Sequence, residues 1–347
     1  MSLTKLKELI QKYGPFVILG LIIFFILFYS VKIGVSIYTN NKGANIVTNP
    51  IFGVINNPEI KNTTTSAGLK FKLDTIEGRP VTATRSANVY FLPPQTTKFG
   101  YRDKISNIAA ELGFNNIDSY TLNGDAVEFN EAGRSLTINI TNFDFDFKYD
   151  YKNDTDLFTR SIIPTKEEVE KKTKEILKSL GKFSNEFDQN LTITNYFFFN
   201  SDKKVEVPVA RNIDANIAEV NLYRGQLDGI STVSKRFPNS NNYVALVATD
   251  KDYVVVEAHI RFYERSQSQI GIYPLINGNQ AYQSLEDGKG IVLADLDKGN
   301  KTKIIKKMSV GYFESDVYFE YLEPVYIFEG EGFSSIVWAI NSEHPKK

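Results

Sequence analysis

The sequence predicts an α+β protein in which one N-terminal transmembrane helix is followed by antiparallel β-sheets with a few helices packed on them. Three observations predict this class. An uncharged apolar run lies near the start of the chain. Most later segments alternate apolar and polar residues, which is the period of half-buried strands. Amphipathic stretches at 102–114, 164–181 and 277–288 interrupt them at helical spacing, so helix-plus-sheet units repeat along the chain.

The apolar run is the predicted membrane anchor, residues 13–37. Its 19 residues from Tyr13 to Val31 carry no charge. As a helix they would span roughly 28 Å, close to the thickness of the hydrocarbon core of a bilayer. A cleaved signal peptide is the alternative, but its apolar region would be shorter and would end at a small-residue site. The expected anchor residues are Tyr13, Pro15, Phe24, Phe25, Phe28, Tyr29 and Lys32.

The charges that flank this run predict its orientation. Three lysines precede the run, and only two follow it closely. By the positive-inside rule, residues 1–12 are cytoplasmic and the rest of the chain lies outside the cytoplasm. The predicted localisation is therefore the cell membrane, crossed once.

Composition divides the remainder of the chain into four parts. Residues 38–67 are rich in Asn and Thr without a sustained period, which indicates a linker or stalk. Within it, the apolar patch 51–55 is a candidate for docking on the folded part. Residues 68–162 and 163–341 are predicted to form two extracytoplasmic α+β domains, and residues 342–347 a tail.

The clearest strand pattern lies at 143–151, where aromatic residues alternate with charged ones. One face of this strand is therefore aromatic, and the other carries Asp144, Asp146 and Asp150. Residues two apart on a strand stand about 7 Å apart, whereas a calcium loop needs a turn that brings several oxygens together. The three carboxylates thus predict a solvated strand face.

The helix at 164–181 has the most complete sequence signals. Thr165 followed by Glu168 predicts a capping box, the first turn is acidic, and Gly181 marks the end. The strands expected after it cover 191–200, 203–210, 215–225, 243–249 and 253–265.

Composition and motifs exclude several classes of function. The absence of cysteine excludes disulfides, thiolate catalysis and cysteine-ligated metals. A net charge of −1 at pH 7 gives no basic field for nucleic acid. Only His259, in a strand, and His344, in the tail, could act as imidazole groups. No serine-hydrolase elbow, Walker loop, zinc motif or dinucleotide fingerprint is present, so we expect no enzyme, no cofactor and no metal site.

The C-terminal segments carry a family pattern. A short helix with an Ala and a Leu precedes a Gly-Tyr strand, a strand with Pro-Val-Tyr and a final Val-x-Ala strand, all within 272–341. This segment resembles the C-terminal part of the YycH/YycI-type regulatory proteins, which belong with or near the PepSY-like domains. The matching positions, which we interpret as packing and turn residues, are Tyr273, Pro274, Ala281, Leu285, Gly288, Gly290, Gly311, Tyr312, Pro324, Tyr326, Phe328, Val337 and Ala339.

The resemblance implies a function as well as a fold. Proteins of this type are single-span, face outward and bind a sensor histidine kinase or another envelope partner. They have no catalytic residues to carry over to this chain.

An aromatic run in the strand at 191–200 suggests a contact surface. Three consecutive phenylalanines place rings on both faces of a strand. A central core strand is one interpretation, and an apolar surface for a partner protein or a sugar ring is the other. The candidate partner surface is Tyr196, Phe197, Phe198, Phe199 and Trp338.

The leading hypothesis is a non-enzymatic, membrane-anchored protein whose outer part binds an envelope protein and regulates a membrane sensor. Aromatic surfaces and exposed sheet edges would supply the contacts. A glycan-binding wall module is the first alternative, and it needs exposed tyrosines or Trp338 in a groove. A carboxylate-based hydrolase is the second, and it needs two close carboxylates in a cleft. The carboxylates weighed for it at a predicted hairpin are Glu314, Asp316, Glu320 and Glu323.

Overall fold

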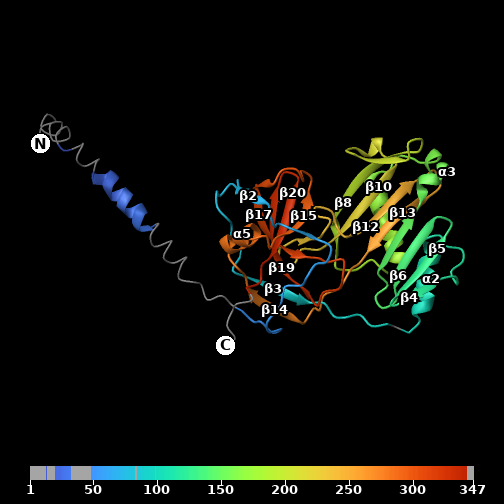
Figure 1. The fold of residues 1–347 in the computed structure, drawn as a ribbon, viewed down its shortest axis with the longest axis horizontal. Coiled ribbons are helices and arrows are strands. Elements are labelled where there is room, and N and C mark those ends of the chain that lie inside the picture. Colours follow the sequence, from blue (N-terminus) through green and yellow to red (C-terminus); the bar gives the residue numbers. More distant parts are fainter. Residues whose placement is uncertain (1–12, 14–19, 33–47, 83, 98, 342–347) are drawn as a thin grey trace, which may run out of the picture. The chain divides into compact units, whose positions relative to one another are not determined.

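The computed structural model describes residues 13, 20–32, 48–82, 84–97 and 99–341 (Figure 1). The chain divides into two units, Met1–Val47 and Thr48–Lys347. Each unit is described by itself below.

In the first unit the described residues form a helix over 20–32. Thirteen residues at 1.5 Å each reach only about 20 Å. In the described part of the chain, no helix is long and apolar enough to cross a membrane. This finding contradicts the transmembrane helix predicted over 13–37, and with it the predicted localisation and the anchored form of the α+β class.

The predicted anchor residues fall partly on this helix. Pro15 and the predicted cytoplasmic segment 1–12 lie outside the described residues. The other anchor candidates all have exposed side chains: Tyr13, Phe24, Phe25, Phe28, Tyr29 and Lys32.

The second unit is an α+β structure whose largest part is a nine-stranded sheet. Its strand order is β4-β5-β6-β7-β13-β12-β10-β8-β9, and every neighbouring pair is antiparallel. Both predicted domains, 68–162 and 163–341, contribute strands to it. The strands are β4 (Thr121–Asn123), β5 (Ala126–Glu131), β6 (Arg134–Asn139), β7 (Phe145–Tyr149), β8 (Phe187–Asn200), β9 (Val205–Val209), β10 (Ile217–Arg224), β12 (Asn242–Ala248) and β13 (Tyr253–Ile260).

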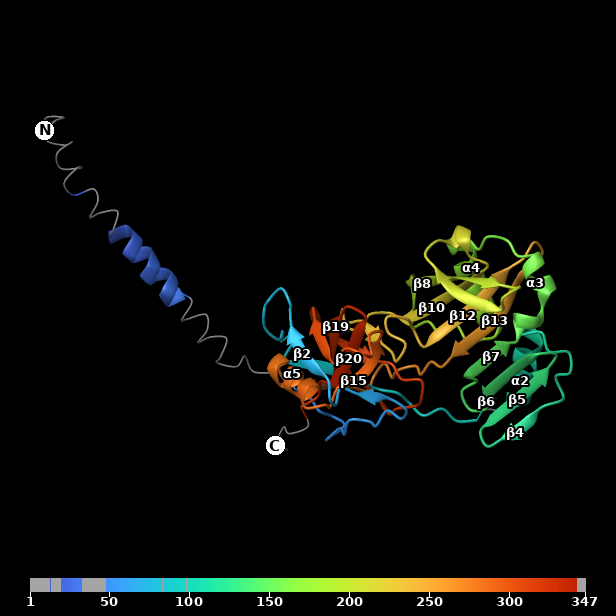
Figure 2. The same ribbon diagram turned by 45° about the horizontal axis from the view of Figure 1, so that its top comes forward.

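Two helices cover one face of this sheet, α2 (Tyr101–Glu111) and α4 (Lys166–Ser179) (Figure 2). Both were predicted from their helical spacing. Their buried residues, such as Ile108 and Val169, join the aromatic row of β7 in one apolar core. The predicted capping box differs in detail, because Thr165 donates to the Glu168 carboxylate at 2.6 Å and its side chain does not cap the helix backbone.

A short helix, α3 (Thr155–Thr159), covers part of the opposite face, next to the 3₁₀ turns η1 (Tyr151–Asn153) and η2 (Asn212–Asp214). Leu157 of α3 packs there against Phe199, Ile217 and Val247.

The C-terminal part is built on a six-stranded sheet of order β1-β15-β20-β19-β17-β11. Helix α5 (Gly278–Glu286), the third predicted helix, packs on it through Ala281 and Leu285. Its N-terminus has a capping box between Asn277 and Gln280 that the sequence analysis missed. The strands are β1 (Thr64–Thr65), β11 (Thr232–Val233), β15 (Ile291–Asp295), β17 (Lys307–Phe313), β19 (Pro324–Gly330) and β20 (Phe333–Trp338).

Two small sheets complete the unit. One has the order β14-β3-β18, and the other pairs β16 with β2 in parallel. Their strands are β2 (Lys70–Leu73), β3 (Ser86–Phe91), β14 (Ile270–Pro274), β16 (Thr302–Ile305) and β18 (Tyr321–Leu322).

The described end of the predicted linker packs on these small sheets. Asn49 bridges Ile272 of β14. The Phe52 ring lies 4.8 Å from the Tyr321 ring, centroid to centroid, and Ile55 is buried. The apolar patch at 51–55 therefore docks on the fold, as its composition suggested.

The family-pattern residues of the C-terminal part occupy core and turn positions. Gly288 ends α5 with φ +80°, and a Cβ there would lie 2.9 Å from Ala67 Cα. The buried members of the pattern are Tyr273, Pro274, Ala281, Leu285, Gly290, Gly311, Tyr312, Pro324, Tyr326, Phe328, Val337 and Ala339.

A buried arginine connects the nine-stranded sheet to the six-stranded one. Arg224, at the end of β10, is 2% exposed. Its guanidinium pairs with Glu186 and with Glu314, which follows β17, and donates to the Tyr263 carbonyl at 2.7 Å. The guanidinium also lies over the Phe262 ring, 4.1 Å from its centroid.

Replacing Arg224 should strongly destabilise the second unit. In Arg224→Met, the buried Glu314 would lose its cation and Glu186 would keep only Arg265 at 3.8 Å, so we expect a loss of about 3–5 kcal/mol in the free energy of unfolding. Urea unfolding followed by tryptophan fluorescence and circular dichroism measures it. The matched control, Arg211→Met, removes a mostly exposed pair with Asp214 and should leave the free energy of unfolding nearly unchanged, because solvent screens this pair. Equal losses in the two variants would contradict the joining role of Arg224.

The turn after α5 should reject any side chain. Gly288→Ala combines a left-handed φ with the approach to Ala67, and we expect a loss of about 1–3 kcal/mol in the same assay. Gly299→Ala is the control, because its Cβ would meet nothing closer than 3.8 Å. A Gly288→Ala protein as stable as the control would show that this turn relaxes freely.

Candidate functional site

The predicted aromatic surface is divided between the two large sheets. Phe198 is 40% exposed and Phe199 is buried, both on β8, and Tyr196 and Phe197 are half-buried. Trp338 lies on β20 of the other sheet, where its ring packs against Phe313. The structure therefore brings only Phe198 of this set to the open surface.

The aromatic side chains on the two faces of β8 are buried to different extents. Phe199 faces α3, and its ring lies 4.7 Å from the Phe158 ring, centroid to centroid. Tyr196 packs on the other face, against the core beneath α4. Phe198 shares the Tyr196 face but is exposed.

A hollow of about 600 Å³ lies beside Phe198. Four exposed apolar side chains from three chain segments line it: Ile162, Ile163, Phe198 and Ile213. We call these four residues and the space between them the apolar hollow. Its rim is polar, with Ser161, Asn200 and Asp214. Ile162 and Ile163 precede helix α4, and Ile213 lies in η2, so isolated apolar residues in polar loops were the only sequence signal for this site.

The edge strand β9 continues the apolar hollow. Val207 and Val205 face Phe198 and Asn200 across the β8–β9 pair, and they are 43% and 50% exposed. β9 ends the nine-stranded sheet on this side. The strip formed by Phe198, Val207 and Val205 thus leads from the hollow to an open sheet edge.

The side chain of Asn216 determines which backbone groups this edge presents. It accepts a hydrogen bond from Phe199 N and donates to Phe199 O. The backbone of Phe199 therefore points away from β9, and that of Glu206, directly opposite, points outward. Pro208, two residues on, adds a carbonyl but no N–H to this edge.

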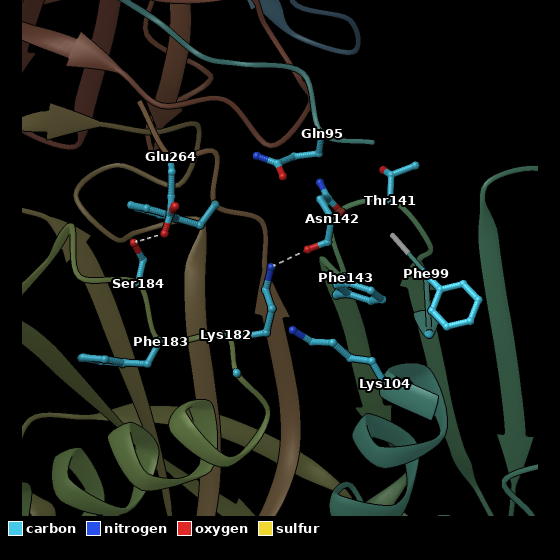
Figure 3. Close-up of a pocket in the computed structure, with 13 residues that line it drawn as sticks. Gln95, Phe99, Lys104, Thr141, Asn142, Phe143, Lys182, Phe183, Ser184 and Glu264 are labelled. Carbon is cyan, nitrogen blue, oxygen red and sulfur yellow. Dashed lines mark hydrogen bonds between the residues drawn. The ribbon is translucent and has the colours of Figure 1, made fainter. Parts of the chain in front are cut away.

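A second pocket, of about 310 Å³, lies between α2, the β6–β7 turn and the loop after α4 (Figure 3). Two of its lining residues are lysines, Lys104 and Lys182, and we call it the lysine pocket. Glu264 and Ser184 lie across the pocket from Lys104 and hydrogen bond to each other at 2.9 Å. Lys182 and Asp144 are 38 positions apart, so no local motif pointed to this site.

Lys182 is held by a buried ion pair. Its Nζ lies 2.7 Å from Asp144 Oδ1 and 3.0 Å from the Asn142 carbonyl. Burial raises the pKa of Asp144, and the Lys182 ammonium opposes this shift. The predicted solvated face is therefore wrong for Asp144, because Phe143 takes a left-handed φ of 58° and the next residue turns into the core.

The neighbouring carboxylate, Asp146, has a different role. It pairs with His259 and Arg261 across the sheet. Burial acts to raise the pKa of Asp146, but these two partners hold it below its usual value. Among the described residues, no group of three or more histidine, aspartate or glutamate side chains is placed to hold a metal ion.

The carboxylates of the predicted hairpin are only partly solvated. Glu314 is buried against Arg224, and Glu323 is 3% exposed. Glu323 Oε2 has no hydrogen-bond partner among the described residues, and burial raises the pKa of this carboxyl to about 8. Charges that were expected to keep strands soluble are thus part of the interior.

The two alternative functions gain no support. Trp338 packs against Phe313 instead of lining a groove, so the expected sugar platform is not formed there. Among the described lining residues of the lysine pocket, Glu264 is the single carboxylate, and a glycoside hydrolase needs two.

Comparison with known proteins gives distant matches only. No protein-family model matches the chain, and no curated protein matches it. An uncharacterized protein from Eubacterium rectale matches 80% of this chain and 91% of its own, at 13% identity and a TM-score of 0.35. YycH from Bacillus subtilis matches 75% of this chain, at 11% identity and a TM-score of 0.36, and this chain spans 56% of it.

Both TM-scores are too low to assign a fold or a function. The resemblance of residues 272–341 to the YycH/YycI-type proteins therefore rests on the sequence pattern alone. No family model or curated relative adds to that resemblance. Membership in the family therefore stays a prediction.

The buried Glu323 should make stability depend on pH. Its pKa of about 8 lies above the usual value, so the folded chain keeps a proton that the unfolded chain has already released. The contribution of Glu323 to the free energy of unfolding is fully present below pH 4.5 and is lost as the pH rises to about 8. The loss is up to about 1.4 kcal/mol per pH unit. Glu323→Gln should remove this slope in urea unfolding measured at pH 5, 6, 7 and 8. Glu331→Gln, on a 90% exposed side chain, is the control. Parallel pH slopes for Glu323→Gln and wild type would contradict the prediction.

Proposed function

We propose that this chain is a binding protein and not an enzyme, and that it binds an extended segment of a partner protein at the apolar hollow and the edge of β9. The partner segment would insert an apolar side chain among Ile162, Phe198 and Ile213. Its backbone would pair with the outward groups of Glu206. Binding of this kind is addition of a strand to a sheet edge, anchored by a pocket for one side chain.

The observation that carries this proposal is the gathering of four exposed apolar side chains in one hollow. Exposed apolar residues are ordinarily scattered singly over a protein surface. Here Ile162, Ile163, Phe198 and Ile213 come from three separate segments and line the same space. A polar rim around an apolar centre is the usual composition of a protein-binding site.

The open edge of β9 supports an extended partner. Glu206 offers an N–H and a carbonyl, and Pro208 offers a carbonyl, so a short strand has three backbone groups to pair with. An added strand would place alternate side chains beside Val205 and Val207, which lead to the hollow. The missing N–H of Pro208 limits the length of the added strand and disfavours pairing with long foreign strands.

The sequence resemblance supplies the class of partner to test first. Residues 272–341 resemble proteins that bind sensor histidine kinases, so the sensor kinases of the source organism are the first candidates.

The test places a photo-reactive amino acid at Ile213 of the full chain in living cells. We expect one partner to be crosslinked there and not from a control position, Leu296, which is 86% exposed elsewhere on the surface. The purified partner should then bind Phe198→Ser at least about tenfold more weakly than wild type, as expected for the loss of a central apolar anchor. Leu296→Ser should bind as wild type does.

A second pair of variants tests the sheet edge. Glu206→Pro removes the outward N–H, whereas Glu206→Ala keeps it. Binding should weaken several-fold in the proline variant beyond the alanine variant. A partner that binds Phe198→Ser and Glu206→Pro as tightly as wild type would overturn the proposal.

A further inference from the structure

The lysine pocket has two oppositely charged sides. Lys104 and Lys182 supply ammonium groups on one side (Figure 3). Glu264 supplies a carboxylate on the other, held by its hydrogen bond from Ser184. The lysines are half-buried and Glu264 is exposed, so the cationic side is deeper and the anionic side lies nearer to solvent.

Lys182 has capacity for a ligand. Its side chain is 10% exposed, and its ammonium carries three protons. Asn142 and Asp144 account for two of them, and within the described residues no further acceptor is assigned to the third. Because Lys182 lines the pocket, a hydrogen-bond acceptor of a ligand that enters there can accept a hydrogen bond from this third N–H.

Lys104 is positioned on the same side by two features of the chain. Its Nζ lies 4.6 Å from the centroid of the Phe143 ring. A Cβ at position 181 would lie 3.3 Å from this Nζ, so Gly181, with φ +63°, leaves room for the ammonium. The pocket thus depends on two left-handed residues, Phe143 and Gly181.

The turn that carries Phe143 is rigid. Asn139 Oδ1 accepts hydrogen bonds from Thr141 N at 2.9 Å, from Thr141 Oγ1 and from Asn142 N at 3.2 Å. A left-handed conformation is unfavourable for a phenylalanine and persists where the surroundings enforce it, which is common at ligand sites. The wall of the pocket is therefore fixed before any ligand enters.

We propose that the lysine pocket binds a small zwitterion of the amino-acid class. Its carboxylate would accept a hydrogen bond from Lys182 and lie near the ammonium of Lys104, and its own ammonium would lie against Glu264. Phe143, Phe183 and Phe262 form apolar walls, which favours an aliphatic or aromatic side chain on the ligand. A volume of about 310 Å³ is at the small end of ligand pockets and suits a single amino acid.

The experiment is isothermal titration of the full chain with a panel of apolar L-amino acids. For the tightest binder, the same titration uses the acid that lacks its amino group and the amine that lacks its carboxylate. We expect both truncated compounds to bind at least about tenfold more weakly, because each loses one charged contact. If none of the panel binds at millimolar concentration, or if the acid alone binds as tightly as the amino acid, the proposal is overturned.

Two variants assign the two sides of the pocket. Lys104→Gln should weaken the binding of the amino acid and of the acid but not that of the amine. Glu264→Gln should weaken the binding of the amino acid and of the amine but not that of the acid. Lys171→Gln and Glu175→Gln, an exposed pair on α4, are the matched controls and should change nothing. Lys182 is left intact, because its loss would strand the buried Asp144. Equal binding of all three compounds to wild type and both pocket variants would place the ligand elsewhere and refute the assignment.

Discussion

The buried charge of Arg224 is the constraint on which the arrangement of the second unit depends. A guanidinium that is 2% exposed must keep its anionic partners, because an uncompensated buried charge costs several kcal/mol. Its partners are Glu186, the residue before β8, and Glu314, which follows β17, so the two large sheets are joined at the end of β10. The same guanidinium lies over Phe262, a wall of the lysine pocket. The Arg224 guanidinium therefore contacts both the junction of the two large sheets and one wall of the lysine pocket.

Strand β8 shows how one run of aromatic residues serves the interior and the surface. Phe199 and Tyr196 lie on opposite faces, each under a helix, whereas Phe198 shares the Tyr196 face and is exposed. Side-chain alternation alone would bury Phe198 as fully as its neighbours. Phe198 is therefore the ring of this face that is available to a partner.

The periodicity of the sequence predicted the helices and many of the strands, but it could not predict contacts between residues far apart in the chain. The helices at 102–114, 164–181 and 277–288 and the alternating strand at 143–151 are present because their patterns match a one-sided core. The prediction of a transmembrane helix from the uncharged run at 13–31 was wrong. Composition shows only that such a run could cross a membrane, and the helix described there covers only 20–32. Asp144 also misled, because the left-handed Phe143 changes which way it points. Tertiary packing alone brings together Lys104, Lys182 and Glu264. Neither the cationic nor the anionic side of the lysine pocket could therefore be predicted from the sequence.

The docking of the segment at 49–55 has a mechanical consequence. Asn49 bridges Ile272 near the start of the folded unit, and at its other end Ile340 bridges Leu275 and Asn341 N donates to the Pro274 carbonyl. Both ends are therefore attached to β14 and the residue that follows it. A tensile force applied between them would reach these few bridges to β14 before it reached β19 and β20 of the six-stranded sheet.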